Sequence, residues 1–287
     1  MAVTFVNGQY VNADEAVLPV NDLAVIRGFG AFDFLRTYGG KPFRLTANIE
    51  RLRRSCALIT LAFPWSNEEV SEIVYETLRR NALPEANIRI LVTGGVSPDF
   101  FTPTGKSSLL VMVAPLRPLA AEIYEKGEKA VTVRMDRIVH GAKSINYIPG
   151  IIAMNQARAA NAIEALFLSP NDDVLEGTTT NLFVVKNGIL ITPEEPILPG
   201  ITRNVVLELV EGEMSVEIRS VPRSELYDAD EAFITASNKQ IVPIVQVDDM
   251  TIGPGVPGPI TRRVMELFHA ETARTATQPL PAPQGGA

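Results

Sequence analysis

The sequence is short of the residues that build disulfide-rich and metal-binding proteins. Its 287 residues include one cysteine, Cys56, so no disulfide can form within the chain. Cys56 lies in the helix-like segment NIERLRRSCALITL, which favours a buried apolar thiol over a nucleophile. The chain has two histidines and no cluster of cysteine with histidine, so we predict no metal site.

A basic surface and a long hydrophobic run are also missing. The chain has 33 Asp and Glu against 26 Lys and Arg, a net charge of -7, which opposes binding to nucleic acids and acidic membranes. Its first residues, MAVTFVNGQYV, have neither the basic nor the apolar region of a signal peptide. No window approaches the roughly 18 apolar residues of a membrane span. We therefore expect a cytoplasmic protein with no membrane or nucleic-acid partner.

Strand-like and helix-like patterns mix along the chain. Hairpin turns are predicted at residues 7–8, 39–40 and 187–188, where Asn-Gly or Gly-Gly pairs occur. Helices are predicted over 46–61, from a capping box at 66–69 onward, and over 151–162, 202–212 and 259–274. Further strands are predicted over 87–95, 108–115, 129–139, 164–169, 181–192, 215–222, 231–237 and 240–247. The expected organisation is an α/β domain at 1–118, a second domain at 119–274 and a disordered Pro/Gly-rich tail at 275–287.

One lysine has unusual neighbours. The segment HGAKSINY places Lys143 among small residues, just after the strand-like run KAVTVRMDRIV. The small side chains leave room for a bulky group beside the lysine amine. The alternative is a solvated loop cation, which is the ordinary state of a lysine.

Three other stretches complement that amine. Glu176 in VLEGTTTNLF precedes three threonines, although a glutamate at the end of a hairpin is the alternative. In PILPGITRNVV a Pro-Gly turn leads into a helix at Ile201 and Thr202, whose unpaired N–H groups suit a phosphate. In FITASNKQIVP, Ser237 and Asn238 either add donors or form a plain polar turn. An amine, a carboxylate and a phosphate cradle are together what pyridoxal 5′-phosphate (PLP) requires.

The segments KSINYIPGIIAMNQARAANAIEALFL, LEGTTTNLFVVKNGILITP, ILPGITRNVV and LYDADEAFITASNKQIVPIVQVD resemble the class IV, or fold type IV, PLP-dependent aminotransferases. The resemblance also includes VNGQYV, RGFGAFDFLRTYGG and ANIERLRRSC, and so covers nearly the whole chain. It implies a small N-terminal α/β domain, a larger barrel-like C-terminal domain and an active site between them. It also implies a homodimer in which the partner's N-terminal domain completes the pocket.

The resemblance assigns roles to particular residues. Lys143 becomes the Schiff-base lysine and proton shuttle, and Glu176 becomes the partner of the pyridine nitrogen. Tyr147 follows the lysine by four residues, where branched-chain members of the family have five. The other expected cofactor contacts are Arg51, Ile201, Thr202 and Ser237 at the phosphate, Leu198 on one face of the ring and Tyr147 at the ring oxygen.

The substrate site departs from both main branches. Typical D-amino-acid enzymes of the family hold the substrate carboxylate with an Arg-x-His pair, where this chain has GGVSPDFF. The branched-chain segment YGTSVFEGIR becomes RGFGAFDFLR, which retains Phe32 and introduces Arg27 and Asp33. Arg89 falls in an apolar strand, where an arginine needs an anion: either a substrate carboxylate or an acid such as Asp33. We expect substrate binding by Arg27, Phe32 and Arg89.

The expected activity is transfer of an amino group between an amino acid and a 2-oxo acid, in two half-reactions. The altered carboxylate contacts favour an atypical D-amino-acid transaminase, with branched-chain L-amino acids as the alternative. Aminodeoxychorismate lyase, which shares the fold and cofactor, is a further alternative, but its lysine is followed by a segment unlike SINYIPG. A binding module without activity would leave the joint presence of lysine and glutamate unexplained.

Overall fold

The computed structural model of the chain describes residues 2–194 and 196–277, which form two compact units. Of the described residues, the first unit contains 2–117, 142–146 and 271–277, and the second contains 118–141, 147–194 and 196–270. The short segment Ala142–Asn146 thus belongs to the first unit, although its neighbours in sequence on both sides belong to the second.

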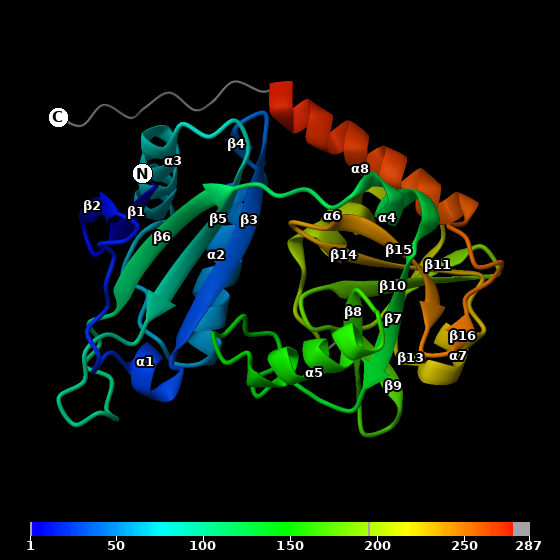
Figure 1. Cartoon of the computed structure of the whole chain (residues 1–287), viewed down its shortest axis with the longest axis horizontal. Coiled ribbons are helices and arrows are strands. Elements are labelled where there is room, and N and C mark those ends of the chain that lie inside the picture. The colour runs from blue at the N-terminus through cyan, green and yellow to red at the C-terminus, as the bar shows by residue number, and fades with distance from the viewer. Residues whose placement is uncertain (1, 195, 278–287) are drawn as a thin grey trace. The chain divides into compact units, whose positions relative to one another are not determined.

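The first unit is built on an antiparallel sheet of six strands (Figure 1). These strands are β1 (Val3–Val6), β2 (Gln9–Asn12), β3 (Gly30–Tyr38), β4 (Lys41–Pro42), β5 (Ala86–Thr93) and β6 (Ser108–Pro115), in the order β2-β1-β6-β5-β3-β4. The hairpin predicted at residues 7–8 is confirmed. Asn7 and Gly8 there have φ angles of 46° and 90°, the positive values that a tight two-residue turn requires.

Two long helices share one hydrophobic core with this sheet. Helix α2 (Leu45–Leu58) packs on β3, and α3 (Asn67–Asn81) packs on β1 and β6. The predicted capping box is confirmed, since Ser66 and Glu69 bond each other's main-chain N–H groups. Helix α2 ends three residues before the predicted position. A short helix that was not predicted, α1 (Leu23–Arg27), precedes β3.

The second unit contains a mixed sheet (Figure 1). Its strands are β7 (Glu128–Val133), β8 (Glu164–Leu168), β9 (Asp173–Gly177), β10 (Asn181–Lys186), β11 (Ile189–Thr192), β12 (Val216–Ile218), β13 (Val221–Pro222), β14 (Glu231–Ala236), β15 (Gln240–Val247) and β16 (Met250–Thr251). The order is β12-β11-β10-β14-β15-β7-β8-β9-β13, with β16 beside β15. Strand β7 pairs in parallel with β8 and β15. The strand predicted over 129–139 ends at Val133, and the residues beyond it form a loop.

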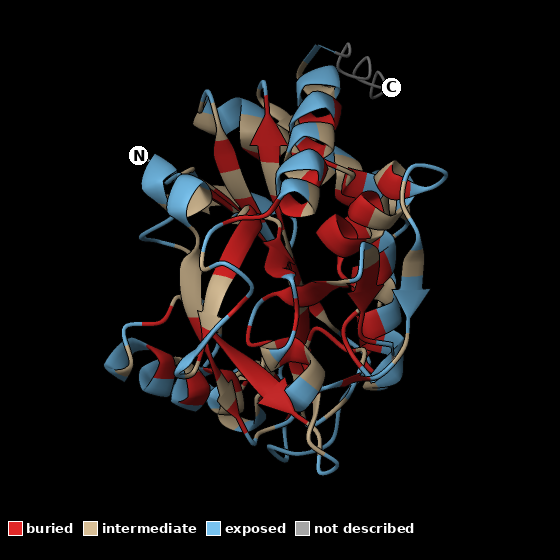
Figure 2. Ribbon diagram, turned by 90° about the vertical axis from the view of Figure 1, so that its right-hand side faces the viewer, coloured by how far each residue is buried: buried red, intermediate tan, exposed pale blue. Residues whose placement is uncertain are grey.

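Both faces of this sheet are covered. Its helices are α4 (Ala121–Lys126), α5 (Ile148–Ala159), α6 (Ile201–Val210), α7 (Arg223–Tyr227) and α8 (Pro259–Thr277), the last of which has its residues from Glu271 onward in the first unit. Strand β8 is buried along its whole length: Phe167 packs with α5, and Leu166 packs in a second core. A strand buried on both faces is apolar without alternation. Buried residues accordingly concentrate on the strands (Figure 2).

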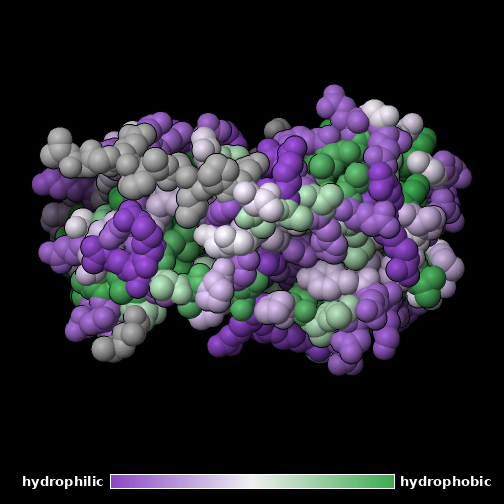
Figure 3. Space-filling model, turned by 90° about the horizontal axis from the view of Figure 1, so that it is seen from above, coloured by the Kyte–Doolittle hydropathy of each residue, from purple (hydrophilic) through white to green (hydrophobic). Residues whose placement is uncertain are grey.

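Helix α8 extends to Thr277, so residues 275–277 of the predicted tail are helical. Residues 278–287 lie outside the described residues. The face in Figure 3 mixes hydrophilic and hydrophobic side chains. Among the described helices, none is long and apolar enough to cross a membrane.

Candidate active site

Lys143 lies on ordered main chain at the edge of β3. Strand β4 pairs with the last two residues of β3, and the Lys143 segment occupies the edge before them. Phe32 N donates to Lys143 O at 2.9 Å, and Ile145 N donates to Gly30 O at 3.0 Å. Gly30 suits this close packing, since a Cβ there would lie 2.8 Å from the main-chain Val92 O of β5 and 2.9 Å from Ile145 Cδ1.

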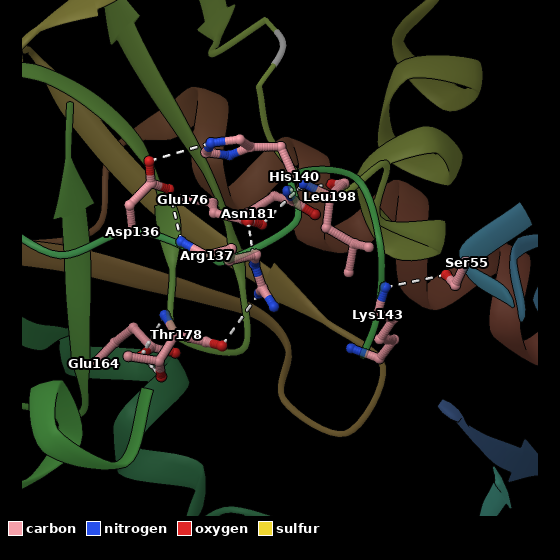
Figure 4. A network of polar contacts seen from close by, with 10 residues as sticks. All are labelled: Ser55, Asp136, Arg137, His140, Lys143, Glu164, Glu176, Thr178, Asn181 and Leu198. Carbon is pink, nitrogen blue, oxygen red and sulfur yellow. Dashed lines mark hydrogen bonds and ion pairs between the residues drawn. The ribbon is translucent and has the colours of Figure 1, made fainter. Parts of the chain in front are cut away.

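The side chain of Lys143 is 8% exposed, so the alternative of a solvated loop cation is wrong. Its Nζ lies 4.9 Å from the centre of the Phe32 ring. Its main-chain N donates to Ser55 Oγ at 3.0 Å (Figure 4). Helix α2 and strand β3 thus hold the lysine from two directions.

Arg51 pairs with a buried aspartate. Its Nε and Nη2 contact the two carboxylate oxygens of Asp33 at 2.9 and 2.8 Å, and both residues are buried. The sequence had suggested Asp33 as a partner of Arg89 instead. That pairing is wrong, because Asp33 points from β3 toward the helices and is bound by Arg51.

Arg89 is exposed, so it does not require the buried anion that the apolar pattern of β5 suggested. The charged side chain stands on the face of the sheet opposite the helices, with its Cζ 5.3 Å from the centre of the Phe32 ring. Within the described part of the chain no carboxylate pairs with it. Arg27, also exposed, ends α1 and donates from Nη1 to the carbonyl oxygen of Ile26 at 3.0 Å.

In the second unit, Glu176 near the end of β9 forms an ion pair that the sequence did not predict. Arg137, from the loop after β7, donates from Nε to Glu176 Oε1 at 2.5 Å and from Nη2 to Thr178 O at 3.3 Å (Figure 4). Leu198 N donates to Glu176 Oε2 at 3.2 Å. The sequence gave no sign of this role, because the segment of Arg137 was predicted as the end of a strand, and no local pattern links it to Glu176, which lies 39 residues further along the chain.

The groups around Arg137 stabilise its positive charge. Burial opposes the charged guanidinium, but the Glu176 carboxylate and Tyr147 outweigh it and raise the pKa of Arg137. The guanidinium carbon lies 5.6 Å from the centre of the Tyr147 ring. Tyr147 occupies the N-cap position of α5, where its side chain makes no capping hydrogen bond and its ring faces the arginine instead.

The N-terminus of α6, where the cofactor phosphate is expected to bind, is open. Gly200 is the N-cap of α6, and among the described residues no side chain caps the first N–H groups of that helix. A Cβ on Gly200 would lie 1.9 Å from Asn181 Oδ1, whose Nδ2 donates to Leu198 O at 2.9 Å. Ile201 and Thr202 open the helix and are buried, as is Leu198.

Ser237 lies in the turn after β14, and a second ion pair holds this turn. Lys239 Nζ contacts the carboxylate of Glu164, at the start of β8, at 3.0 Å. Thr178 and Thr179 also donate to Glu164. Burial opposes ionisation of Glu164, but Lys239 and the hydrogen bonds outweigh it and lower its pKa. The turn of Ser237 is therefore tied to the loop that follows Glu176.

Two further predictions from the sequence concern the cysteine and metal binding. Cys56 is fully buried in α2, and burial raises the pKa of its thiol to about 12, which confirms an inert apolar cysteine over a nucleophile. Over the ranges 2–194 and 196–277, no group of three or more His, Cys, Asp or Glu side chains is placed to hold a metal ion.

Comparison with known proteins gives one consistent result. Residues 30–247 match the model of the family "Amino-transferase class IV". A putative branched-chain-amino-acid aminotransferase of Methanocaldococcus jannaschii is 37% identical over 275 residues, which cover 92% of this chain and 94% of the relative. A D-alanine aminotransferase of Staphylococcus haemolyticus is 31% identical over 277 residues, 94% of this chain and 97% of the relative.

Among solved structures, the branched-chain amino acid aminotransferase of Thermoproteus uzoniensis with norvaline matches with a TM-score of 0.87. It is 30% identical and covers 95% of this chain and 95% of its own. The α/β architecture expected from the sequence, that of fold type IV, is confirmed. The family match, the curated relatives and the fold all agree: the chain is an aminotransferase and belongs to class IV.

Proposed function

We propose that this aminotransferase uses PLP and takes a D-amino acid as its preferred amino donor, with a 2-oxo acid as acceptor. The observation that carries the proposal is that Lys143 and Arg89 approach the same ring, Phe32, at 4.9 and 5.3 Å. These distances put the two cations within about 10 Å of each other. An amino acid whose amino group takes the place of the Lys143 amine at the cofactor can therefore have a carboxylate that pairs with Arg89.

The residues present fit PLP. When bound, PLP supplies an aldehyde that condenses with amines and a protonated ring that accepts electrons from the substrate. Lys143 offers the amine, and Glu176, bound by Arg137, offers an anion for the ring nitrogen. The open N-terminus of α6 and Ser237 offer donors for the phosphate. The other proposed contacts are Arg51 at the phosphate, Leu198 against the ring and Tyr147 at the ring oxygen.

Lys143 has a second task in this proposal. With PLP bound, its Nζ would take the proton from the substrate α-carbon and deliver it to the cofactor carbon that carried the aldehyde, and the second half-reaction would run this transfer in reverse. Its main-chain bonds to Ser55 and Phe32 limit the positions that Nζ can reach, which keeps the proton transfer short. The ring of Phe32 lies against Nζ and shields it from water.

Arg89 and Arg27 select the substrate. A guanidinium binds a carboxylate through two parallel hydrogen bonds, which fixes orientation as well as charge. Arg89 is exposed and has no acid partner among the described residues, so its charge is available for a ligand. Arg27 is the second proposed contact. This use of arginines, in place of the Arg-x-His pair of typical D-amino-acid enzymes, supports an atypical member of that branch.

Branched-chain L-amino acids are the second candidate. The Methanocaldococcus relative and the Thermoproteus structure carry branched-chain names, whereas the Staphylococcus relative is named for D-alanine. The homodimer expected from the family, with the partner's N-terminal domain at the pocket, is part of the same proposal, as is a cytoplasmic location.

The test begins with the cofactor. Protein incubated with PLP and reduced with borohydride should carry the phosphopyridoxyl group on Lys143, identified by mass spectrometry of the digested chain. Lys143→Ala should carry none and should lose turnover by orders of magnitude, with unchanged circular dichroism. A label on another lysine would contradict the assignment, and no label in the parent protein would favour a binding module.

The same preparation then reports the substrate. A panel of D- and L-amino acids is read by the absorbance change of the PLP-loaded protein, without an acceptor. We expect D-amino acids to react at least about tenfold faster than their L-forms, a difference of about 1.4 kcal/mol in transition-state binding. Faster reaction of L-leucine or L-valine would instead establish the second candidate.

A further inference from the structure

Two consecutive residues of β3 contact the two cofactor-site candidates of the first unit, Arg51 and Lys143. Successive side chains of a strand point to opposite faces. Asp33 points toward α2 and receives Arg51 through two contacts of 2.9 and 2.8 Å, while its Oδ1 also accepts from Phe34 N at 2.7 Å. Phe32, on the other face, contacts Lys143 through its ring and donates its main-chain N–H to Lys143 O.

Ser55 joins the other ends of these contacts. It lies one helical turn after Arg51 in α2 and is fully buried. Its Oγ donates to Arg51 O at 2.9 Å and accepts from Lys143 N at 3.0 Å. The interactions therefore form a closed ring, from Asp33 to Arg51, Ser55, Lys143 and Phe32 and back along β3.

The Asp33 carboxylate contacts one edge of the Arg51 guanidinium. A guanidinium has five N–H donors, and this contact uses Nε and one N–H of Nη2. The edge that carries Nη1 points away from Asp33. A buried pair of this kind gives little net stability compared with apolar side chains, but it fixes the direction of the arginine.

We propose that Asp33 and Ser55 are positioning residues: Asp33 orients Arg51 toward the cofactor phosphate, and Ser55 fixes Lys143 to the same turn of α2. The inference rests on the proposed PLP site and extends it to two residues that do not touch the cofactor. It predicts separate effects, because Asp33 acts on the phosphate contact and Ser55 acts on the lysine.

The experiment measures binding of PLP and of pyridoxal, which lacks the phosphate, to the unloaded protein. The ratio of the two dissociation constants reports the phosphate contact alone. Asp33→Asn should lower this preference for PLP by about tenfold or more, with pyridoxal affinity nearly unchanged. Asp33→Glu keeps the buried charge but displaces the arginine, so it should lower the preference for PLP as well. It provides the test if Asp33→Asn fails to fold.

Ser55→Ala should weaken the binding of both ligands and not the preference between them. Pyridoxal and PLP should both bind several-fold more weakly, and Lys143 should react at a changed rate with an amine-specific reagent, measured on its peptide by mass spectrometry. Ser71→Ala is the matched control, since Ser71 Oγ in α3 also donates to a helical carbonyl, Asn67 O at 2.8 Å. We expect Ser71→Ala to change neither quantity.

Arg51→Ala distinguishes a failure of the proposed phosphate contact from a failure of the positioning role of Asp33. If it leaves the preference for PLP unchanged, Arg51 does not hold the phosphate, and both that part of the proposed site and the role of Asp33 are refuted. If Arg51→Ala lowers the preference but both Asp33 variants retain it, the site stands and Asp33 has no positioning role. Equal losses for PLP and pyridoxal in the Asp33 variants, or parent-like pyridoxal binding in Ser55→Ala, would also overturn the inference.

Discussion

At the scale of single residues, the site depends on which charges have partners. Arg51 is buried and Arg137 is half-buried, and each binds one carboxylate, Asp33 or Glu176, so their charges are compensated within the protein. Arg89 differs because it is exposed and lies over an aromatic ring without an acid beside it among the described residues. A cation in that state can exchange water for a substrate carboxylate at low cost.

Arg89→Ala should therefore weaken binding of amino acids selectively. We expect the half-saturating amino-acid concentration to rise by about one to two decades, since a charged hydrogen bond is worth about 1.5–3 kcal/mol. A matched amine without the carboxylate should be a poor substrate of the parent and lose little further in the variant. Arg80→Ala is the control, because Arg80 also lies over a ring, 4.2 Å from Tyr10. Parallel losses on the amine and the amino acid would rule out the carboxylate contact.

At the scale of elements, one buried carboxylate connects three segments of the second unit. Glu164 opens β8, Lys239 belongs to the turn between β14 and β15, and Thr178 follows β9. The lowered pKa of Glu164 means that the unfolded chain takes up this proton before the folded chain does. The stability from Glu164 is thus fully present above its ordinary pKa of 4.5 and declines as the pH falls below it.

Glu164→Gln should consequently destabilise the protein by about 1.5–3 kcal/mol at neutral pH. The difference from the parent should shrink as the pH falls below about 4.5, because the parent then loses the same charge. Urea unfolding between pH 3 and 8, followed by circular dichroism, measures this. Glu266→Gln, at an exposed position of α8, serves as control and should show no such difference. A constant gap across the pH range would argue against the ion pair as its source.

At the scale of the whole molecule, exposed hydrophobic residues support the proposed homodimer. Phe100 and Phe101, in the loop between β5 and β6, are 52% and 74% exposed. Adjacent exposed aromatic side chains are unusual on a monomer and typical of an interface. Light scattering should give a mass of about 62 kDa, twice the 31.2 kDa of the chain.

Replacing both phenylalanines with serine should shift the protein toward monomer at micromolar concentration. Val256→Ser is the matched control, because Val256 is 55% exposed in the second unit and is expected to leave the mass unchanged. A monomeric parent, or a double variant that dimerises like the parent, would show that this loop is not part of an interface.

The sequence by itself determined the local elements and the outline of the site. Periodic apolar positions, the capping box at Ser66 and the turn at Asn7–Gly8 predicted elements that the structure contains, since these signals act over a few residues. Small residues around Lys143 and the motif at Glu176 pointed to the chemistry of the family to which the chain belongs.

Only the tertiary structure decided which charges meet. Asp33 faces Arg51 rather than Arg89, and Arg137 reaches Glu176 from a loop predicted as strand. Lys143 completes the edge of β3, although most of its neighbours in sequence fold with the second unit. Such pairings depend on which side of a strand is covered by a helix and where a sheet edge is left open. Both are properties of distant segments packed together, and no local pattern of residues specifies them.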